Sequence, residues 1–140
     1  MTKSEFDDAV IDWHRDQGGF GGNPAGHALR MLREVVELCI ACGARQYDIH
    51  EAVAQELVKA IRRDEMGKQN VEHMLEETAD VDMLFTIFQK YFIPYYQEWD
   101  AREAKFEVVK ARRWEVDSDG VLWRPGTKPA VVPGASAESS

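Results

Sequence analysis

Apolar residues recur at helical spacing through most of this chain and predict a helical protein. The first stripe consists of Phe6, Val10 and Trp13, which lie three or four residues apart as on one face of a helix. The same periodicity returns four more times before residue 115. We therefore expect five helices, over residues 4–17, 25–42, 48–63, 71–91 and 94–114.

Local signals set the expected ends of these helices. Ser4 begins a sequence that resembles a capping box, and Gly43 follows the second helix as a terminator. Asp48 is the expected cap of the third helix, and Pro94 suits the first turn of the fifth. Residues 18–26 are rich in glycine but lack the spacing of a phosphate-binding loop, so their pattern predicts a flexible connector.

The second helix carries apolar residues around more than half of its circumference, so we expect it to be largely buried. Those apolar residues are Leu29, Leu32, Val35, Val36, Leu38, Cys39 and Ile40. A narrow polar stripe remains, formed by Arg30, Arg33, Glu34 and Glu37.

The C-terminal region has a different pattern. Asp119 and Gly120 stand between β-favouring residues and predict a hairpin, and the Pro- and Ser-rich residues 124–140 predict an arm or tail. The sequence thus indicates an all-α bundle of about five helices over residues 1–114. A short hairpin and an extended tail follow at 115–140.

The fourth helix places charge where apolar residues are expected. Glu77 and Asp80 project from the same face as its apolar residues Leu84, Ile87, Phe88 and Tyr91. An ionised carboxylate that faces a core costs on the order of several kcal/mol of folding free energy. A cation or a basic partner is needed to compensate two of them. This helix is the first place to look for a ligand.

Glu34 and Glu37 form a second pair with the same spacing, on the polar stripe of the second helix. If the two helices pack face to face, four carboxylates meet and require divalent cations, for which oxygen ligands favour Mg²⁺ or Mn²⁺. The alternative is a structural network in which Arg30, Arg33 or the basic stretch 105–113 neutralises the carboxylates. A di-iron bundle would need Glu-x-x-His on two helices, and the sequence has no such set.

Charge and composition narrow the class of protein. The net charge of −8 argues against general affinity for nucleic acid, so a phosphate-bearing ligand needs a local basic cluster. Such a cluster ends the fifth helix and consists of Lys105, Lys110, Arg112 and Arg113. Cations are also common there because they favour the helix dipole. No apolar run approaches the roughly 20 residues that span a bilayer, and the N-terminus is polar, so we expect no membrane partner and a cytoplasmic location.

Three segments in this order resemble the MazG-like all-α NTP pyrophosphohydrolases, in particular the phage type. They are GHALRMLREVVEL (26–38), EETADV (76–81) and KFEVVKARRW (105–114). The sequence departs from compact members in the longer separation between its acidic motifs. It also has Val109 where phage relatives often have Asn.

The resemblance implies a hydrolase that converts a (d)NTP and water into a (d)NMP and pyrophosphate. Its Mg²⁺ ligands would be Glu34, Glu37, Glu77 and Asp80, with Mn²⁺ able to substitute. The catalytic residues would be Glu37, which orients or deprotonates the attacking water, and Glu34. Phosphate contacts would come from Lys105 and Arg112, with Lys110 and Arg113 as further candidates.

The family also implies a homo-oligomer, a dimer or a tetramer, and in a virus a location in the host cytoplasm. Trp13 and Phe20 are the candidates for stacking on the base, and core packing is the alternative for both. We expect a purine dNTP, dGTP or dATP, as the substrate. The alternatives are a dUTP or dCTP hydrolase on the same scaffold, and a non-catalytic nucleotide-binding or oligomeric interaction module.

Overall fold

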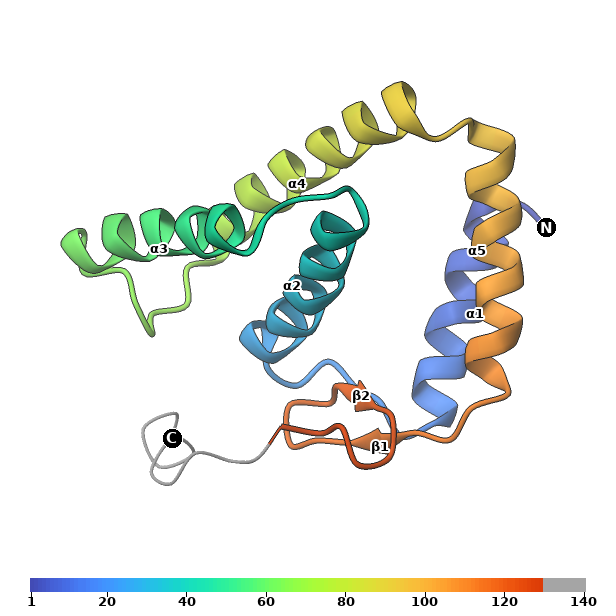
Figure 1. Ribbon diagram of the computed structural model, residues 1–140. Helices are drawn as coiled ribbons and strands as arrows, with labels where there is room; N and C mark the ends of the chain where they lie inside the picture. The colour runs from blue at the N-terminus through green and yellow to red at the C-terminus, as the bar shows by residue number, and fades with distance from the viewer. Residues whose placement is uncertain (130–140) are drawn as a thin grey trace. The chain divides into compact units, whose positions relative to one another are not determined.

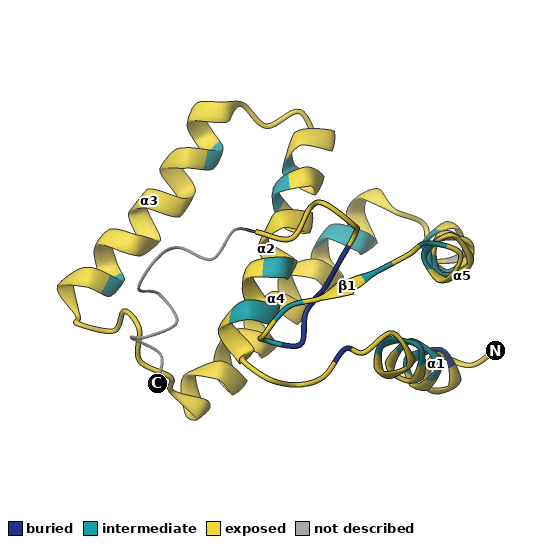
Figure 2. Ribbon diagram, turned by 90° about the horizontal axis from the view of Figure 1, so that it is seen from below, coloured by how far each residue is buried: buried dark blue, intermediate teal, exposed yellow. Residues whose placement is uncertain are grey.

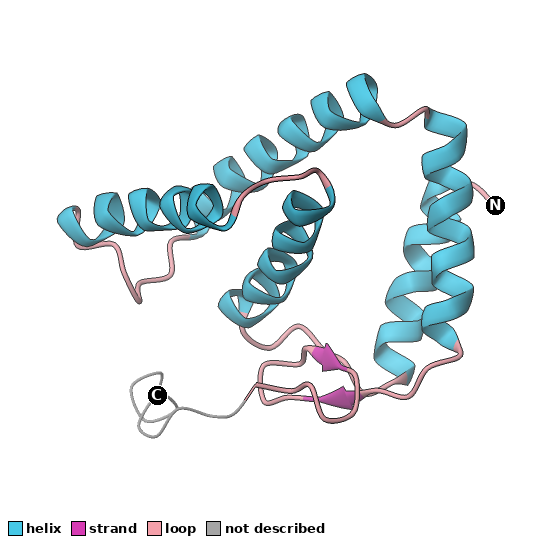
Figure 3. Cartoon of the chain, viewed as in Figure 1, coloured by secondary structure: helices cyan, strands magenta, loops and turns pink. Residues whose placement is uncertain are grey.

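A computed structural model describes residues 1–129 of the chain, with the backbone alone for Tyr96. The prediction of an all-α fold is confirmed, because five helices precede a two-stranded hairpin (Figures 1 and 3). The helices are α1 (Lys3–Asp16), α2 (Pro24–Ala41), α3 (Gln46–Arg62), α4 (Val71–Phe92) and α5 (Tyr95–Lys110). The strands β1 (Glu115–Val116) and β2 (Leu122–Trp123) pair antiparallel.

The chain divides into two compact units, and the division runs through α2 and α5. The first unit contains Met1–Arg33 together with the chain from Lys105 onward, and the second contains Glu34–Ala104. The first unit therefore holds α1, the start of α2, the end of α5 and the hairpin. Most of the predicted tail, residues 130–140, lies outside the described residues.

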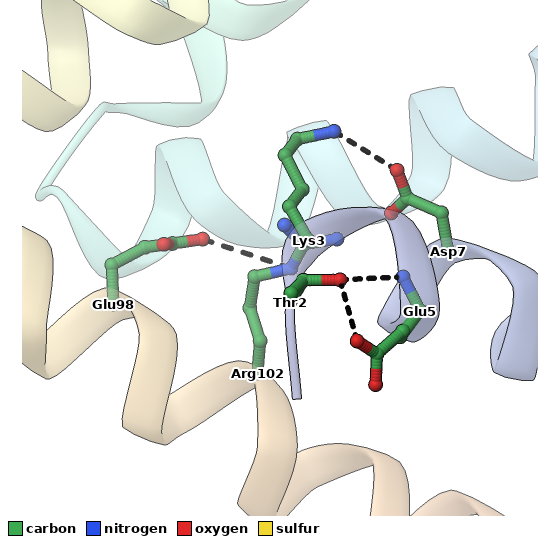
Figure 4. Close-up of polar contacts among 6 residues, drawn as sticks. All are labelled: Thr2, Lys3, Glu5, Asp7, Glu98 and Arg102. Carbon is green, nitrogen blue, oxygen red and sulfur yellow. Dashed lines mark hydrogen bonds and ion pairs between the residues drawn. The ribbon is translucent and has the colours of Figure 1, made fainter.

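The first helix begins earlier than predicted, because Thr2 and not Ser4 caps it. The Thr2 hydroxyl accepts a hydrogen bond from the Glu5 backbone N–H and also contacts the Glu5 carboxylate, both at 3.1 Å (Figure 4). Thr2 and Glu5 have the spacing of a capping box, two residues before the predicted one, and the Thr2 hydroxyl makes both contacts. Lys3 adds an ion pair to Asp7 at 3.0 Å one turn further along.

Of the other predicted end signals, Gly43 acts as expected and Asp48 does not. Gly43 adopts φ +88°, and the N–H groups of Gly43 and Ala44 donate to the last carbonyls of α2. This left-handed ending is a common way to stop a helix. Asn70 caps α4 by accepting from the His73 N–H at 3.1 Å. Asp48 does not cap α3 but lies in its first turn, where it pairs with Arg45 at 2.9 Å.

The fifth helix ends at Lys110, four residues before the predicted end at Trp114. The Trp114 indole N–H donates to the carbonyl of Val109 at 3.0 Å, and the Arg112 N–H donates to the same carbonyl at 3.2 Å. The following segment thus satisfies a terminal carbonyl that a longer helix would have used. This early ending releases residues 111–114 to lead into β1.

The first unit has a small core. Phe6, Val121, Leu122 and Trp123 are 2–6% exposed. Edge-to-face contacts join α1 to the end of α5, with ring centroids 5.5 Å apart for Phe6 and Phe106. The figures show these two helical segments side by side (Figures 1 and 2). Burial of these apolar residues and the contact between the aromatic rings stabilise the first unit.

The second unit is open to solvent, and the prediction that α2 is largely buried is wrong. No residue described in 34–104 is buried, and Val35 and Ile40 of α2 are 48% and 61% exposed (Figure 2). The periodicity of the sequence identifies which face of a helix is apolar. Burial of that face also requires another part of the protein to cover it. The described residues provide no such cover for this helix.

The same result removes the premise that Glu77 and Asp80 face a core. Both are exposed, and Leu84 and Tyr91 beside them are 66% and 80% exposed. The desolvation penalty predicted for these carboxylates therefore does not operate in the single chain. No helix within residues 1–129 combines the length and the apolar character that a bilayer crossing requires.

Candidate functional site

The two acidic pairs lie on different helices of the second unit. Glu34 and Glu37 belong to α2, Glu77 and Asp80 belong to α4, and all four are exposed. Residues three apart are neighbours on a helix surface, so each pair presents two carboxylates in one direction. Because α2 and α4 are helical at these positions, the two carboxylates of each pair are neighbours, as the sequence predicted.

The four carboxylates are not gathered into one cluster. Within residues 1–129, no group of three or more His, Cys, Asp or Glu residues is arranged to hold a metal ion. The donor set itself suits Mg²⁺, which takes carboxylate oxygens and keeps several water ligands. These residues therefore fit Mg²⁺ in chemistry, and each helix offers two ligands rather than a closed site.

Glu37, Glu77 and Asp80 have no ion pair with a Lys or Arg among the described residues, whose ion pairs join other carboxylates. Arg30 and Arg33, the proposed partners in a structural network, lie over the Trp123 ring with guanidinium carbons 5.1 and 4.9 Å from its centroid. The structural-network alternative thus gains no contact at these three carboxylates.

The predicted basic cluster separates into members with different surroundings. Lys110 pairs with Glu107 at 2.6 Å and lies 4.7 Å from the centre of the Phe106 ring. Lys105 is exposed on α5, with no ion pair within residues 1–129. Arg112 and Arg113 follow the end of the helix and are not paired with a carboxylate in that range. The two arginines are therefore better placed than Lys110 to meet an added anion.

Arg112 and Arg113 line an open hollow of about 420 Å³ together with Arg124, Pro125 and Thr127. Arg124 was not among the residues expected from the sequence, because it belongs to the segment assigned to the tail. The predicted hairpin contained the signal that could have found it. Counting outward from the Asp119–Gly120 turn brings the residues after β2 opposite the residues before β1.

The two residues expected to stack on a base have different environments. Trp13 is half-buried, and its ring makes edge contacts with Phe106 and Trp114 at centroid distances of 6.1 and 5.5 Å. Its indole nitrogen is buried and has no hydrogen-bond partner among residues 1–129. Phe20 is 49% exposed and leaves part of its ring open. Phe20 is therefore the more accessible of the two for stacking.

The glycine-rich loop is not merely a flexible connector, because it is bonded to the hairpin turn. The N–H of Phe20 donates to the Gly120 carbonyl, and that of Asn23 donates to the Asp119 carbonyl, both at 3.2 Å. Gly120 has φ +86°, and a Cβ there would overlap the Phe20 carbonyl oxygen. Glycine is required at this position for both reasons.

Asp117 organises the hairpin. Its carboxylate accepts hydrogen bonds from the backbone N–H groups of Asp119 and Val121 at 2.9 and 3.0 Å, and from the Trp123 indole at 2.8 Å. Burial by itself raises the pKa of this carboxyl, but the hydrogen bonds from Trp123, Val121 and Asp119 outweigh burial and lower the pKa below its usual value. The charged form is therefore the one that the hairpin stabilises.

Two histidines to which the sequence assigned no role lie together beside this loop. The rings of His14 and His27 have centroids 5.9 Å apart, and His27 Nε2 is 2.9 Å from the Phe20 carbonyl oxygen. Burial, followed by the charge on His27, lowers the pKa of His14. The neutral form of the His14 imidazole is therefore favoured in the folded chain.

No family model matches the chain, and neither a curated protein nor a solved structure matches it. The candidate site accordingly rests on the chain's own residues.

Proposed function

We propose that this chain is a Mg²⁺-dependent nucleoside triphosphate pyrophosphohydrolase, with a purine dNTP such as dGTP or dATP as its preferred substrate. The observation that carries the proposal is the state of the acidic pairs. Glu37, Glu77 and Asp80 are exposed on two helices of one unit and have no basic partner among residues 1–129. Exposed carboxylates without a basic partner are suited to bind a divalent cation that arrives with a phosphate-bearing substrate.

The residues divide the reaction between them. Glu34, Glu37, Glu77 and Asp80 are the ligands for Mg²⁺, which supplies neutralisation of phosphate charge and activation of water when bound. Glu37 orients the attacking water and accepts its proton, and Lys105 and Arg112 stabilise the charge that develops on the departing pyrophosphate. Phe20, with its half-exposed ring, stacks on the base.

The exposed apolar faces of the second unit support the oligomer that the resemblance implies. Large apolar surfaces on a soluble chain mark contacts with another surface. We assign that surface to further copies of this chain, in a dimer or a tetramer. Packing between copies would also bring acidic pairs from different helices toward one another, which a separate chain does not do.

One assay tests the activity. The full chain is incubated with Mg²⁺ and a panel of NTPs and dNTPs, and the products are identified. Monophosphate with pyrophosphate is the expected outcome, whereas inorganic phosphate alone would assign cleavage to another bond. Binding without any product would favour a non-catalytic nucleotide-binding module. That rival is favoured by the absence of a gathered metal cluster within residues 1–129.

The acidic residues are tested by Glu77→Gln and Glu37→Gln. Loss of a metal ligand or of the water-orienting carboxylate should lower kcat by about 100-fold or more. Asp82→Asn is the matched control, because Asp82 is an exposed carboxylate on the opposite side of α4. Full Mg²⁺-dependent turnover in Glu37→Gln would refute its assigned role.

A further inference from the structure

The open end of the hairpin brings two arginines from distant positions in the sequence to one place. Glu115 of β1 pairs with Trp123 of β2, so the next positions outward are Trp114 and Arg124. Arg113 lies one residue further on the incoming side. Arg112, Arg113 and Arg124 consequently line the same hollow of about 420 Å³.

A tight turn places Pro125 and Thr127 in the lining of this hollow. The N–H and the hydroxyl of Thr127 both donate to the carbonyl of Arg124, at 3.0 and 2.7 Å. Residues 124–127 form this turn, with Pro125 at the second position and Gly126 at the third. The φ of +80° at Gly126 suits that third position. The chain therefore folds back immediately after Arg124 and keeps Thr127 beside it.

The three guanidinium groups carry charge that the described residues do not balance. None of them forms an ion pair with a carboxylate within residues 1–129, although Arg45 pairs with Asp48 at 2.9 Å and Lys110 pairs with Glu107 at 2.6 Å. The carboxylate of Asp117 in the hairpin turn already accepts three hydrogen bonds from the hairpin. Like charges around one hollow repel one another, and a bound anion relieves that repulsion.

We propose that this hollow binds the phosphate chain of a small polyanion, and that Arg124 contacts the phosphates together with Arg112 and Arg113. Guanidinium groups match phosphate oxygens with two parallel N–H donors, which makes arginine the residue suited to such a chain. The hollow is of the size that small ligands occupy. The chain's net charge of −8 disfavours a long nucleic acid in its place.

The identity of the ligand rests on the proposed function, which supplies nucleoside triphosphate as substrate and pyrophosphate as product. The binding site itself does not require turnover. It is therefore tested with inorganic pyrophosphate in the absence of Mg²⁺, by calorimetric titration of the full chain.

The decisive variant is Arg124→Gln, with Lys128→Gln as the matched control. Both side chains are exposed cations after β2, but Lys128 does not line the hollow. We expect Arg124→Gln to weaken pyrophosphate binding by about tenfold, the effect of losing a hydrogen bond to a charged group. Lys128→Gln should change the affinity by less than about twofold, which is the scale of screened surface charge. Arg124→Lys should recover only part of the affinity, because an ammonium lacks the two-pronged donor.

Three results would overturn the site. They are equal weakening by both glutamine variants, no measurable binding of pyrophosphate to the unmodified chain, and tighter binding of a single-stranded oligonucleotide than of pyrophosphate. Thermal unfolding of Arg124→Gln checks that the fold is retained, as expected for an exposed side chain.

The outcome is separable from that of the proposed function. Arg124-dependent binding of pyrophosphate without hydrolysis of any NTP would leave the site standing and refute the hydrolase. Hydrolysis by the unmodified chain, with binding and KM unchanged in Arg124→Gln, would refute the site and leave the hydrolase standing.

Discussion

The surroundings of Trp13 in the first unit indicate a packing role for its ring. Trp13 was a candidate for base stacking, and its ring lies against Phe106 and Trp114 at the junction of α1 and α5. Its indole nitrogen is buried, and the part of the chain that the structure describes offers it no hydrogen-bond partner. An unpaired buried donor costs free energy, so the ring rather than its N–H is what favours tryptophan here.

Substitution of Trp13 should separate these contributions. Trp13→Phe removes the unpaired donor and keeps an aromatic ring, so we expect the free energy of unfolding to change by less than about 1 kcal/mol. Trp13→Ala opens a cavity and should cost about 3 kcal/mol. Urea unfolding measures both. A marked rise of KM in Trp13→Phe at unchanged stability would instead return Trp13 to the nucleotide site.

His14 gives the first unit a sensitivity to pH. Its pKa is lowered in the folded chain, first by burial and then by His27, so the neutral form is favoured by folding. The resulting stability is fully present above the unfolded pKa of about 6.5 and is lost as the pH falls through the folded value. We expect the Tm to fall between pH 7 and pH 5, and to fall less in His14→Gln. Equal pH profiles for the two proteins would contradict this assignment.

At the scale of elements, the hairpin is organised by its turn rather than by its strands. Each strand has two residues, whereas Asp117 alone accepts three hydrogen bonds across the turn. The glycine-rich loop then adds bonds to the carbonyls of Asp119 and Gly120. A two-stranded ribbon of this length is not stable by itself, and these contacts hold it against the glycine-rich loop.

Asp117→Ala should therefore destabilise the first unit by about 2 kcal/mol, because it leaves two backbone donors and an indole without their acceptor. Ser118→Ala changes an exposed neighbour in the same turn, and its free energy of unfolding should be within about 0.5 kcal/mol of that of the unmodified chain.

The lowered pKa of Asp117 gives stability that is present above its unfolded pKa and is lost as the pH falls through the folded value. Trp123 fluorescence during acid titration reports this loss, and an acid transition unchanged in Asp117→Ala would argue against it.

For the whole molecule, the exposed apolar faces are the dominant physical fact. In the second unit Leu84, Ile87 and Tyr91 are 66%, 52% and 80% exposed. Helices gain most of their stability from packing an apolar face, so faces left in water favour association.

We expect the protein in solution to have a mass of two or four times 16.0 kDa, measured by light scattering during size exclusion. Leu84→Glu with Ile87→Glu should shift the mass toward that of one chain. Gln89→Glu, on the opposite side of α4, should leave it unchanged. A single-chain mass for the unmodified protein at all concentrations would refute the oligomer.

The fold class and the approximate course of all five helices were predictable from the sequence, because periodicity and end signals are local. Their ends were less so. Thr2 replaced Ser4 as a cap and α5 stopped at Lys110, since each depends on which side chain satisfies a backbone group.

The tertiary structure decided which residues lie near one another in space. The sequence by itself placed Glu34, Glu37, Glu77 and Asp80 in pairs on two helices, since helical spacing fixes neighbours three residues apart. It did not determine whether those helices are covered or whether the pairs meet, because burial and convergence depend on surfaces far away along the chain. The same reason hid Arg124, which joins Arg112 and Arg113 through the register of the hairpin and the turn that follows it.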